Sequence, residues 1–555
     1  MSRGGEDEVE RTGIRKGSAG CKVLAVGLDG ATFRTLTPLI RQGLMPNLER
    51  MIGAGVSGEL SSVIPTNSAS AWASFMTGCM PARHGVFEFR SRRPGDADRK
   101  EIVNSGHIRR PTVWSMASQS GRTVGAINVP VTYPPEEVNG FVVTGLLTPV
   151  QVGFATHPPD LASELRSAIG RYVVDVEWRE YEGAIPALVQ SLEAMTDSRR
   201  DAALYLMERY RPELLTVVFV APDRLQHCLW PYLDPALAPS AAHAGENHEA
   251  VRRCFSRLDG ALGDLVDKAG PEAQVVVFSD HGMQPTDTQF AINEWLERVG
   301  LLKRRKAHSA LVNALKRVDA PLRSLRRRVP GLANVTGRYH TFSEGAQIDW
   351  SRTRAYSYWD SQQGIRVNLA SREAEGIVAA GEYEALRSEI RTALADLTEP
   401  RTGRKVVAEA WLREECMDGP YAEQAADIVL TAAEGFSTAP AGAHLFEPTG
   451  WRSADHSLDG MLVASGPAMR RSQRIGGARL VDLCPTILYL LGCPIPPGLD
   501  GRMLSDLVAP ELLTSDPPCF VPGEALGGNE ERATPGLSDV EERSLEGRLK
   551  GLGYL

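Results

Sequence analysis

Short apolar runs that end in aspartate are the feature of this 555-residue chain that most constrains its fold. Three such runs end at Asp29, Asp223 and Asp280. Uninterrupted apolar runs of this length are typical of strands that are buried on both faces of a parallel sheet. We therefore predict a strand at each run, with its aspartate at or just beyond the carboxyl end of the strand.

Segments with helical character lie between these runs, and two further apolar runs at 427–430 and 461–466 predict additional strands. The helical segments cover residues 46–54, 186–209, 247–269 and 480–491. Strands that alternate with helices indicate an α/β fold, with a mostly parallel central sheet and helices on both faces. Ligands bind outside the carboxyl ends of strands in such open sheets, so we expect chemistry at the three aspartates.

The domain organisation follows from changes in composition along the chain. We predict a flexible N-terminal tail over residues 1–20, a catalytic domain over 21–505 and a C-terminal extension over 506–555. An insertion of cap-like character is expected at about 290–350, because the stretch 303–328 contains ten Lys or Arg residues. Three roles are open for this stretch: a solvated helical face, a cap that attracts anionic substrate, or a contact with an anionic membrane surface.

Charge and cysteine usage exclude several classes of protein. The net charge of −8 and the pI of about 5.9 give no reason to expect nucleic-acid binding. The eight cysteines are scattered without a CxxC pair, which argues against a disulfide framework and against a cysteine zinc site. The sequence shows no apolar signal segment near its start and no long apolar run, so we expect a cytoplasmic enzyme.

The polar residues near the predicted strands are of the types that bind metal ions. Carboxylates and imidazoles together suit zinc, and manganese less selectively, and six such ligands can hold two divalent ions. The candidates are Asp29, Asp223, His227, Asp280, His281 and His456. His444 is the competing candidate for the position of His456.

A hydroxyl nucleophile is expected in the segment that ends at Gly78. This segment offers Ser68, with Thr66 and Ser70 as alternatives. A serine hydroxyl is weakly nucleophilic until a base or a metal ion activates it. A position at the start of a helix would also direct backbone N–H groups at a phosphate. His84 follows this segment, and we assign it a structural role in the turn.

The order of these motifs resembles the alkaline phosphatase superfamily, specifically its type I phosphodiesterase / nucleotide pyrophosphatase branch. The resemblance spans about residues 22–504 and rests on LAVGLDG, IPTNSASAWASFMTGCMPARHGVFEF, VAPDRLQH, FSDHGM and the late histidine before a strand. It implies an alkaline-phosphatase-like fold. It also implies a metal-dependent hydrolase of phosphate esters, acting on phosphodiester or pyrophosphate bonds.

The resemblance also implies how the metal ligands divide. Asp29, Asp280 and His281 would hold one ion, whereas Asp223, His227 and His456 would hold the other. Ser68 matches the nucleophile position, where it would bridge both ions, attack phosphorus in line and form a phosphoseryl intermediate. Ala71 stands where many members have an asparagine that contacts a phosphate oxygen, so nucleotide specificity is an open question. The C/S-x-P-x-R motif of sulfatases is absent from the segment around Ser68.

Two alternatives to a phosphodiesterase remain open at this stage. The first is a phosphomonoesterase or a phosphotransferase/mutase of the same superfamily, although the chain shows no equivalent of the large mutase insertion. The second belongs to another class, a non-catalytic metal-binding regulatory protein on this fold. Loss of a ligand or of the nucleophile would signal it, and the sequence retains both.

Overall fold

The computed structural model describes residues 20–93, 96–234, 237, 244–305, 348–358, 363–521 and 536–554. The chain separates into two compact units. The first unit comprises Met1–Asp287, Glu414–Ala425 and Thr449–Leu555, and the second comprises Thr288–Arg413 and Ala426–Pro448. The tail at 1–19 and most of the basic stretch, at 306–328, lie outside the described residues, so the three roles considered for that stretch stay predictions.

The first unit is built around a nine-stranded, mostly parallel sheet. Its strands are, in spatial order, β19 (Gln473–Arg479), β2 (Val56–Ser61), β18 (Asp459–Ser465), β9 (Gln274–Phe278), β1 (Val23–Leu28), β8 (Leu214–Phe219), β5 (Val124–Ile127), β6 (Gly140–Val143) and β7 (Thr156–His157). β18 runs antiparallel to both of its neighbours, and β7 runs antiparallel to β6. All residues of β1 and β8 are buried, which explains their unbroken apolar sequences.

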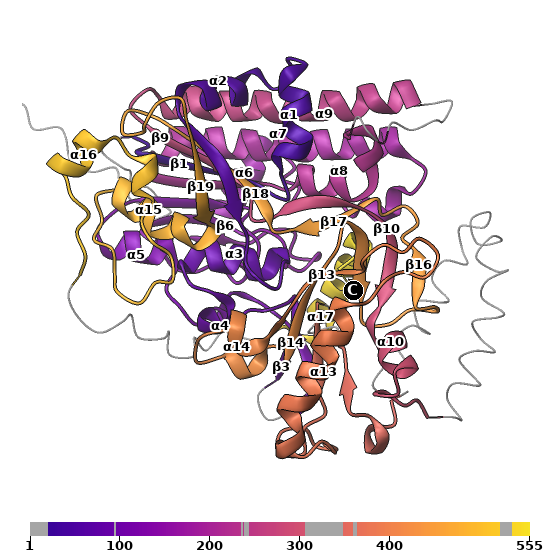
Figure 1. Cartoon of the computed structure of the whole chain (residues 1–555). Helices are drawn as coiled ribbons and strands as arrows, with labels where there is room; N and C mark the ends of the chain where they lie inside the picture. Colours follow the sequence, from indigo (N-terminus) through magenta and orange to yellow (C-terminus); the bar gives the residue numbers. More distant parts are fainter. Residues whose placement is uncertain are drawn as a thin grey trace, which may run out of the picture. The chain divides into compact units, whose positions relative to one another are not determined.

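Helices cover both faces of this sheet, which confirms the predicted α/β class. Figure 1 shows α2 (Pro46–Ala54), α7 (Ile185–Tyr210) and α9 (Ala244–Ala269) on one face, and α3 (Ser68–Thr77), α5 (Val113–Gln119) and α15 (Leu483–Leu490) on the other. The long helices α7 and α9 pack side by side. An apolar core fills the space between the layers, with Leu24, Val26, Leu192, Leu206 and Leu265 fully buried.

The second unit has a sheet of its own. Its strands are, in order, β11 (Ala355–Tyr356), β12 (Gly364–Val367), β14 (Ile428–Ala432) and β13 (Val407–Leu412), and all pair antiparallel. The helix α13 (Tyr383–Ala395) packs against this sheet through Leu386, Ile390 and Leu394. The apolar run at 427–430 is therefore a strand of this smaller sheet and not of the central one.

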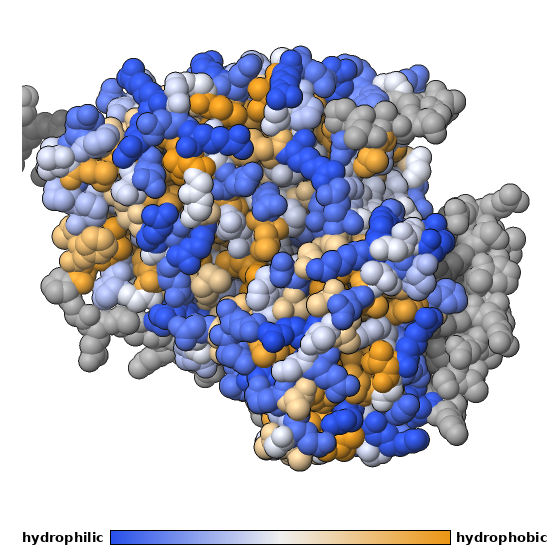
Figure 2. Space-filling model, in the orientation of Figure 1, coloured by the Kyte–Doolittle hydropathy of each residue, from blue (hydrophilic) through white to orange (hydrophobic). Residues whose placement is uncertain are grey.

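The C-terminal residues 536–554 belong to the first unit and end in helix α17 (Asp539–Leu552). Ser538 and Glu541 form a capping box at its start. On the face of the molecule in Figure 2, hydrophobic residues are interspersed with hydrophilic ones. Within the described part of the chain, no helix has the length and apolar character needed to cross a membrane.

Candidate metal centre

The topology brings the carboxyl ends of three strands to one place in the first unit. β1 lies between β8 and β9, with Leu28 level with Phe219 and Gly27 level with Phe278. All three strands are parallel, so the residues that follow them meet at the same edge of the sheet. Asp29 and Asp280 lie in the turns after β1 and β9, and each is fully buried.

Helix α8 (Ala221–Leu229) follows β8 and supplies two of the predicted ligands. Asp223 and His227 lie four residues apart, on one face of this helix, and both are buried. The His227 Nε2 atom lies 3.3 Å from Asp223 Oδ1. Gly30, in the turn after β1, leaves room for the Asp223 carboxylate: it has φ +66°, and a Cβ there would lie 3.1 Å from Asp223 Oδ1.

His456 reaches the same place from strand β17 (Ala454–Ser457). This strand pairs antiparallel with β10 (Gly282–Ala291), which puts His456 level with Met283, two residues after His281. The rings of His281 and His456 stack with centroids 3.8 Å apart, and His456 Nε2 lies 3.4 Å from Asp223 Oδ1. The rival candidate His444 is an exposed residue of the second unit.

Ser68 is the first residue of helix α3 and is fully buried. The Asn67 side chain caps the helix by accepting a hydrogen bond from the Ser70 N–H at 3.0 Å. The Ser68 hydroxyl lies 3.2 Å from His281 Nε2. The Thr66 hydroxyl instead donates to the carbonyl of Val63 at 3.2 Å. Ser68 is thus the hydroxyl of this segment that meets the acids and histidines.

Each of the three histidines directs its Nδ1 atom at a backbone carbonyl. His227 pairs with Ala454 O at 3.0 Å, His281 with Gly282 O at 3.1 Å, and His456 with Thr66 O at 3.2 Å. A neutral imidazole that donates from Nδ1 has a lone pair on Nε2, which is the arrangement of a metal-binding histidine. Burial lowers the pKa of all three, that of His281 to about 4, which favours the neutral form.

The carboxylates complete a donor set that fits divalent cations. Asp29 Oδ1, Asp223 Oδ1 and Asp280 Oδ2 are buried and have no hydrogen-bond partner among the described residues. Burial, together with the neighbouring acids, raises the pKa of Asp29 and of Asp280 well above the usual range. Buried carboxylate oxygens and imidazole lone pairs that converge in this way are stabilised by a metal cation.

Possible metal ligands form three compact groups among the described residues. Asp29, Asp280 and His281 offer ligand atoms within 4.8 Å of one another, and so do Asp223, His281 and His456. His227 lies beside the second group, because its Nε2 atom is 3.2 Å from His456 Nε2. A further group joins His227 and His456 to Asp455, which sequence reasoning did not single out. The structure therefore brings all seven predicted site residues together.

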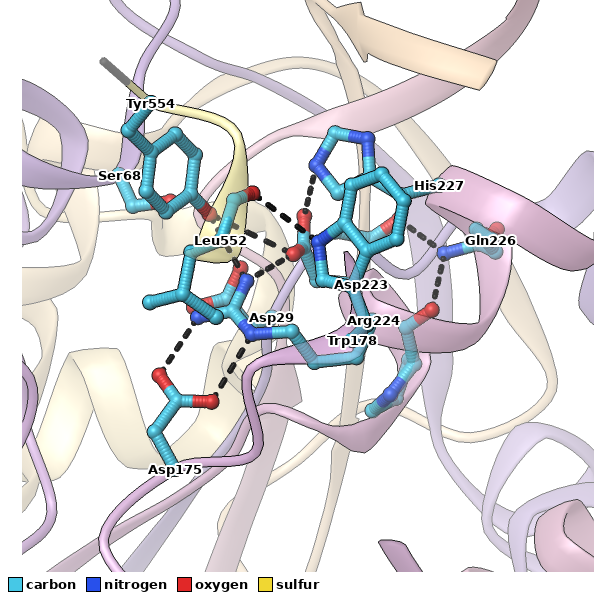
Figure 3. A network of polar contacts seen from close by, with 12 residues as sticks. Asp29, Ser68, Asp175, Trp178, Asp223, Arg224, Gln226, His227, Leu552 and Tyr554 are labelled. Carbon is cyan, nitrogen blue, oxygen red and sulfur yellow. Dashed lines mark hydrogen bonds and ion pairs between the residues drawn. The ribbon is translucent and has the colours of Figure 1, made fainter. Parts of the chain in front are cut away.

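Four other residues at the centre were missed from the sequence. Trp72 is fully buried and donates from Nε1 to Asp29 Oδ2 at 3.1 Å. Arg224 donates to both oxygens of the buried Asp175, from Nε at 2.9 Å and from Nη2 at 2.7 Å. Arg224 also forms an ion pair with Asp223, and it contacts the hydroxyl of Tyr554 near the end of the chain (Figure 3). The sequence spacing of a tryptophan or an arginine near a motif residue does not indicate such contacts.

His84 lies outside this centre. Its Nε2 atom is 2.8 Å from the Ser74 hydroxyl, and its Nδ1 atom accepts from the Val86 N–H at 3.2 Å. Burial lowers the pKa of His84 to about 3, so its ring is neutral. These contacts tie helix α3 to the turn that follows it.

Comparison with known proteins agrees with this geometry. A model of the family described as type I phosphodiesterase / nucleotide pyrophosphatase matches residues 23–459. Phosphonoacetate hydrolase from Sinorhizobium meliloti 1021, solved with phosphonoformate, is similar in structure with a TM-score of 0.53 and 17% identity, over 87% of this chain and 97% of that one. Murine ectonucleotide pyrophosphatase / phosphodiesterase 5, solved as an inactive variant with AMP, has a TM-score of 0.50 and 14% identity, over 88% and 100%. No curated protein sequence matches the chain.

Proposed function

Because the chain belongs to the type I phosphodiesterase / nucleotide pyrophosphatase family, we propose that it hydrolyses phosphodiester or pyrophosphate bonds with Ser68 as the nucleophile. The observation that carries this proposal is the position of the Ser68 hydroxyl. It lies at the first turn of α3, 3.2 Å from His281 Nε2, in a centre whose buried carboxylate oxygens have no hydrogen-bond partner among the described residues. The family match supports small phosphate esters such as nucleotides as substrates.

The donor set suits two divalent cations, and we propose zinc. Asp29, Asp280 and His281, which form one of the compact groups of ligand atoms, would hold the first. Asp223, His227 and His456 would hold the second, with Ser68 contributing to both sites. Three imidazoles and three carboxylates favour zinc over magnesium or calcium, which prefer oxygen ligands alone. When bound, such ions neutralise the charge that develops on the oxygens of the phosphoryl group and on the attacking serine.

The residues of the chain itself position the serine and the phosphoryl group. Helix α3 holds Ser68 at its N-terminus, where the positive end of the helix dipole and the N–H groups of the first turn favour a phosphoryl group. The Ser68 Oγ atom attacks phosphorus in line, the ester oxygen leaves, and a phosphoseryl group is formed. Water then cleaves the bond between Ser68 and phosphorus and regenerates the serine. Burial of the centre excludes bulk solvent from these groups, which strengthens every electrostatic contact there.

Parallel assays with bis-p-nitrophenyl phosphate and p-nitrophenyl phosphate test this function on zinc-loaded protein. We expect faster cleavage of the diester, and we expect Ser68→Ala to lower kcat by about a thousandfold or more. Ser70→Ala is the matched control, because Ser70 is buried in the same helix but its hydroxyl has no hydrogen-bond partner among the described residues. Near-normal activity of Ser68→Ala would overturn the proposal. Faster cleavage of the monoester would instead identify a phosphomonoesterase or a phosphotransferase.

A further inference from the structure

The C-terminal helix α17 packs its apolar face into the core of the first unit. Leu545, Leu549 and Leu552 lie on one side of α17 and are almost fully buried in the core of the first unit. After the helix, Gly553 adopts φ +86° and turns the chain, and the Tyr554 N–H donates to Leu549 O at 2.8 Å. This arrangement is a glycine C-cap of the Schellman type. It fixes the direction in which Tyr554 leaves the helix.

Contacts with distant parts of the first unit hold Tyr554 in place. The Trp178 indole donates from Nε1 to Leu552 O at 3.0 Å, and Arg548 donates from Nη1 to Thr148 O at 2.9 Å. The ring of Tyr554 stacks on Phe89 with centroids 4.4 Å apart and an interplanar angle of 24°. Only 5% of Tyr554 is exposed. Tyr554 is therefore as closely packed as a residue of the core.

The hydroxyl of this tyrosine points into the candidate metal centre. Arg224 donates to it from Nη1 at 2.8 Å, and the phenol lies 3.4 Å from Asp223 Oδ2 (Figure 3). Figure 3 shows Ser68 beside this tyrosine, and although burial raises the pKa of the phenol, contacts that include Ser68 lower it. The ring centroids of His227 and His456 lie 6.4 Å and 6.1 Å away. The tyrosine thus reaches the nucleophile and both histidines of the second proposed metal site.

The directions of these hydrogen bonds leave the phenol with a proton to donate. An arginine has no acceptor, so the Tyr554 oxygen must accept from Arg224. Its own O–H then donates to Asp223 Oδ2 at the long distance of 3.4 Å. An arginine that donates to a hydroxyl polarises it and makes it a stronger donor. A phosphoryl group on Ser68 would bring further oxygens within reach of this donor.

We propose that Tyr554 is a substrate-contacting residue, whose hydroxyl donates a hydrogen bond to a non-bridging oxygen of the phosphoryl group at Ser68. The inference rests on the proposed function of Ser68. Ala71, one turn into helix α3, has no side-chain donor for such an oxygen. Tyr554 supplies one from the far end of the chain, with Arg224 positioning its oxygen. The C-terminal segment is then part of the active site and not an appendage.

Tyr554→Phe tests the contact, because it removes the hydroxyl and keeps the ring that stacks on Phe89. For the diester on zinc-loaded enzyme, we expect kcat to fall by about 10- to 100-fold, with KM changed less than about threefold. Tyr210→Phe is the matched control: Tyr210 is 2% exposed, and its hydroxyl donates to Glu164 at 2.7 Å, away from the centre. The melting temperature and metal content should match the wild type in both variants.

Equilibrium binding of inorganic phosphate to the zinc-loaded proteins gives a second readout that needs no turnover. We expect Tyr554→Phe to weaken phosphate binding by about tenfold, and Tyr210→Phe to leave it unchanged. Unchanged kcat and unchanged phosphate binding in Tyr554→Phe would overturn the inference. So would a gain of activity in that variant, or on removal of residues 554–555, because a gain is the signature of an inhibitory plug. An active Ser68→Ala would instead contradict the proposed function on which the inference rests, whereas phosphate binding measures the contact of Tyr554 without turnover.

Discussion

A cluster of three buried aspartates in the first unit and a single buried aspartate in the second differ in what surrounds their oxygens. At the candidate metal centre, Asp29, Asp223 and Asp280 are fully buried, and each has an oxygen without a hydrogen-bond partner among the described residues. In the second unit, Asp427 is also fully buried. Both of its oxygens, in contrast, accept several hydrogen bonds. The two groups show how the same side chain serves two purposes.

The surroundings of Asp427 satisfy the carboxylate completely. Arg372 donates to both oxygens, at 2.7 Å and 2.6 Å, and the Tyr383 hydroxyl donates at 2.6 Å. The Val367 N–H donates at 2.7 Å and Arg413 at 3.1 Å. Although burial raises the pKa of Asp427, the contacts with Arg372, Tyr383 and the Val367 N–H together outweigh it, so the pKa lies below its usual value. This acid connects helix α13, strand β12 and the residues before β14.

The difference identifies which acids are arranged for a ligand. A buried ion pair with every oxygen satisfied needs nothing further, whereas a cluster of three acids with unsatisfied oxygens is costly until a cation enters it. Asp29 makes the point clearly, because burial, Asp280 and Asp223 all raise its pKa. The metal-free centre therefore stores an unfavourable electrostatic energy that Asp427 does not. Substitutions of Asp29 and of Asp427 test this contrast.

Replacing an acid of the metal centre should have the largest effect. It should lower the activity of the zinc-loaded enzyme and raise the stability of the metal-free protein. We expect Asp29→Asn to lower kcat/KM for the diester by about a thousandfold or more, with loss of bound zinc. In chelator, the same variant should raise the free energy of unfolding by about 1–3 kcal/mol, because it removes one of three clustered negative charges. The amide oxygen can still accept from Trp72. Activity assays, metal analysis and urea unfolding in chelator measure the three outcomes, and a metal-free variant less stable than the metal-free wild type would contradict the contrast.

Asp427→Asn should have the opposite signature. We expect a loss of about 3 kcal/mol in the stability of the second unit, because the change removes the buried negative charge with which Arg372 and Arg413 form ion pairs. The loss should be the same with zinc and with chelator, and the metal content should not change. Asp396→Asn is the matched control, since Asp396 is exposed in the same unit, and its effect should stay within about 0.5 kcal/mol. Urea unfolding followed by a probe in the second unit measures the change. A loss that depends on zinc would show that Asp427 is coupled to the metal centre.

The sequence predicted one of these acid groups and not the other. Asp29, Asp223 and Asp280 follow apolar strands in the order of a known family, so periodicity and resemblance together were enough to place them. Asp427 begins an apolar run, and its partners Arg372 and Tyr383 lie in segments of ordinary polar composition. Nothing in their spacing shows that they meet, because the contacts depend on how helix α13 packs on its sheet.

The place of Tyr554 at the metal centre could not be predicted from the sequence for a related reason. The sequence predicts only a C-terminal extension over residues 506–555, and the distance of Tyr554 from Ser68 along the chain hides the contact. A signal was nevertheless present: Leu545, Leu549 and Leu552 recur at helical spacing, and Gly553 follows at the position of a helix C-cap. These features indicate a helix with a buried face that ends in a fixed turn. They do not say which surface it covers, and only tertiary structure supplies that.

The smallest expected effect is on the pH dependence of stability, and it has opposite signs for Asp427 and Asp29. Because the pKa of Asp427 is lowered in the folded protein, its contribution to stability is present above the usual pKa of 3.8 and is lost as the pH falls through the folded value. The deficit of Asp427→Asn relative to the wild type should therefore shrink on acidification below about pH 4. The pKa of Asp29 is raised, so in chelator its ionised form costs stability at neutral pH, and the advantage of Asp29→Asn should shrink as the pH falls through the raised value. Urea unfolding of the three metal-free proteins across acidic pH measures both gaps, and two gaps of the same sign would refute the distinction between the acids.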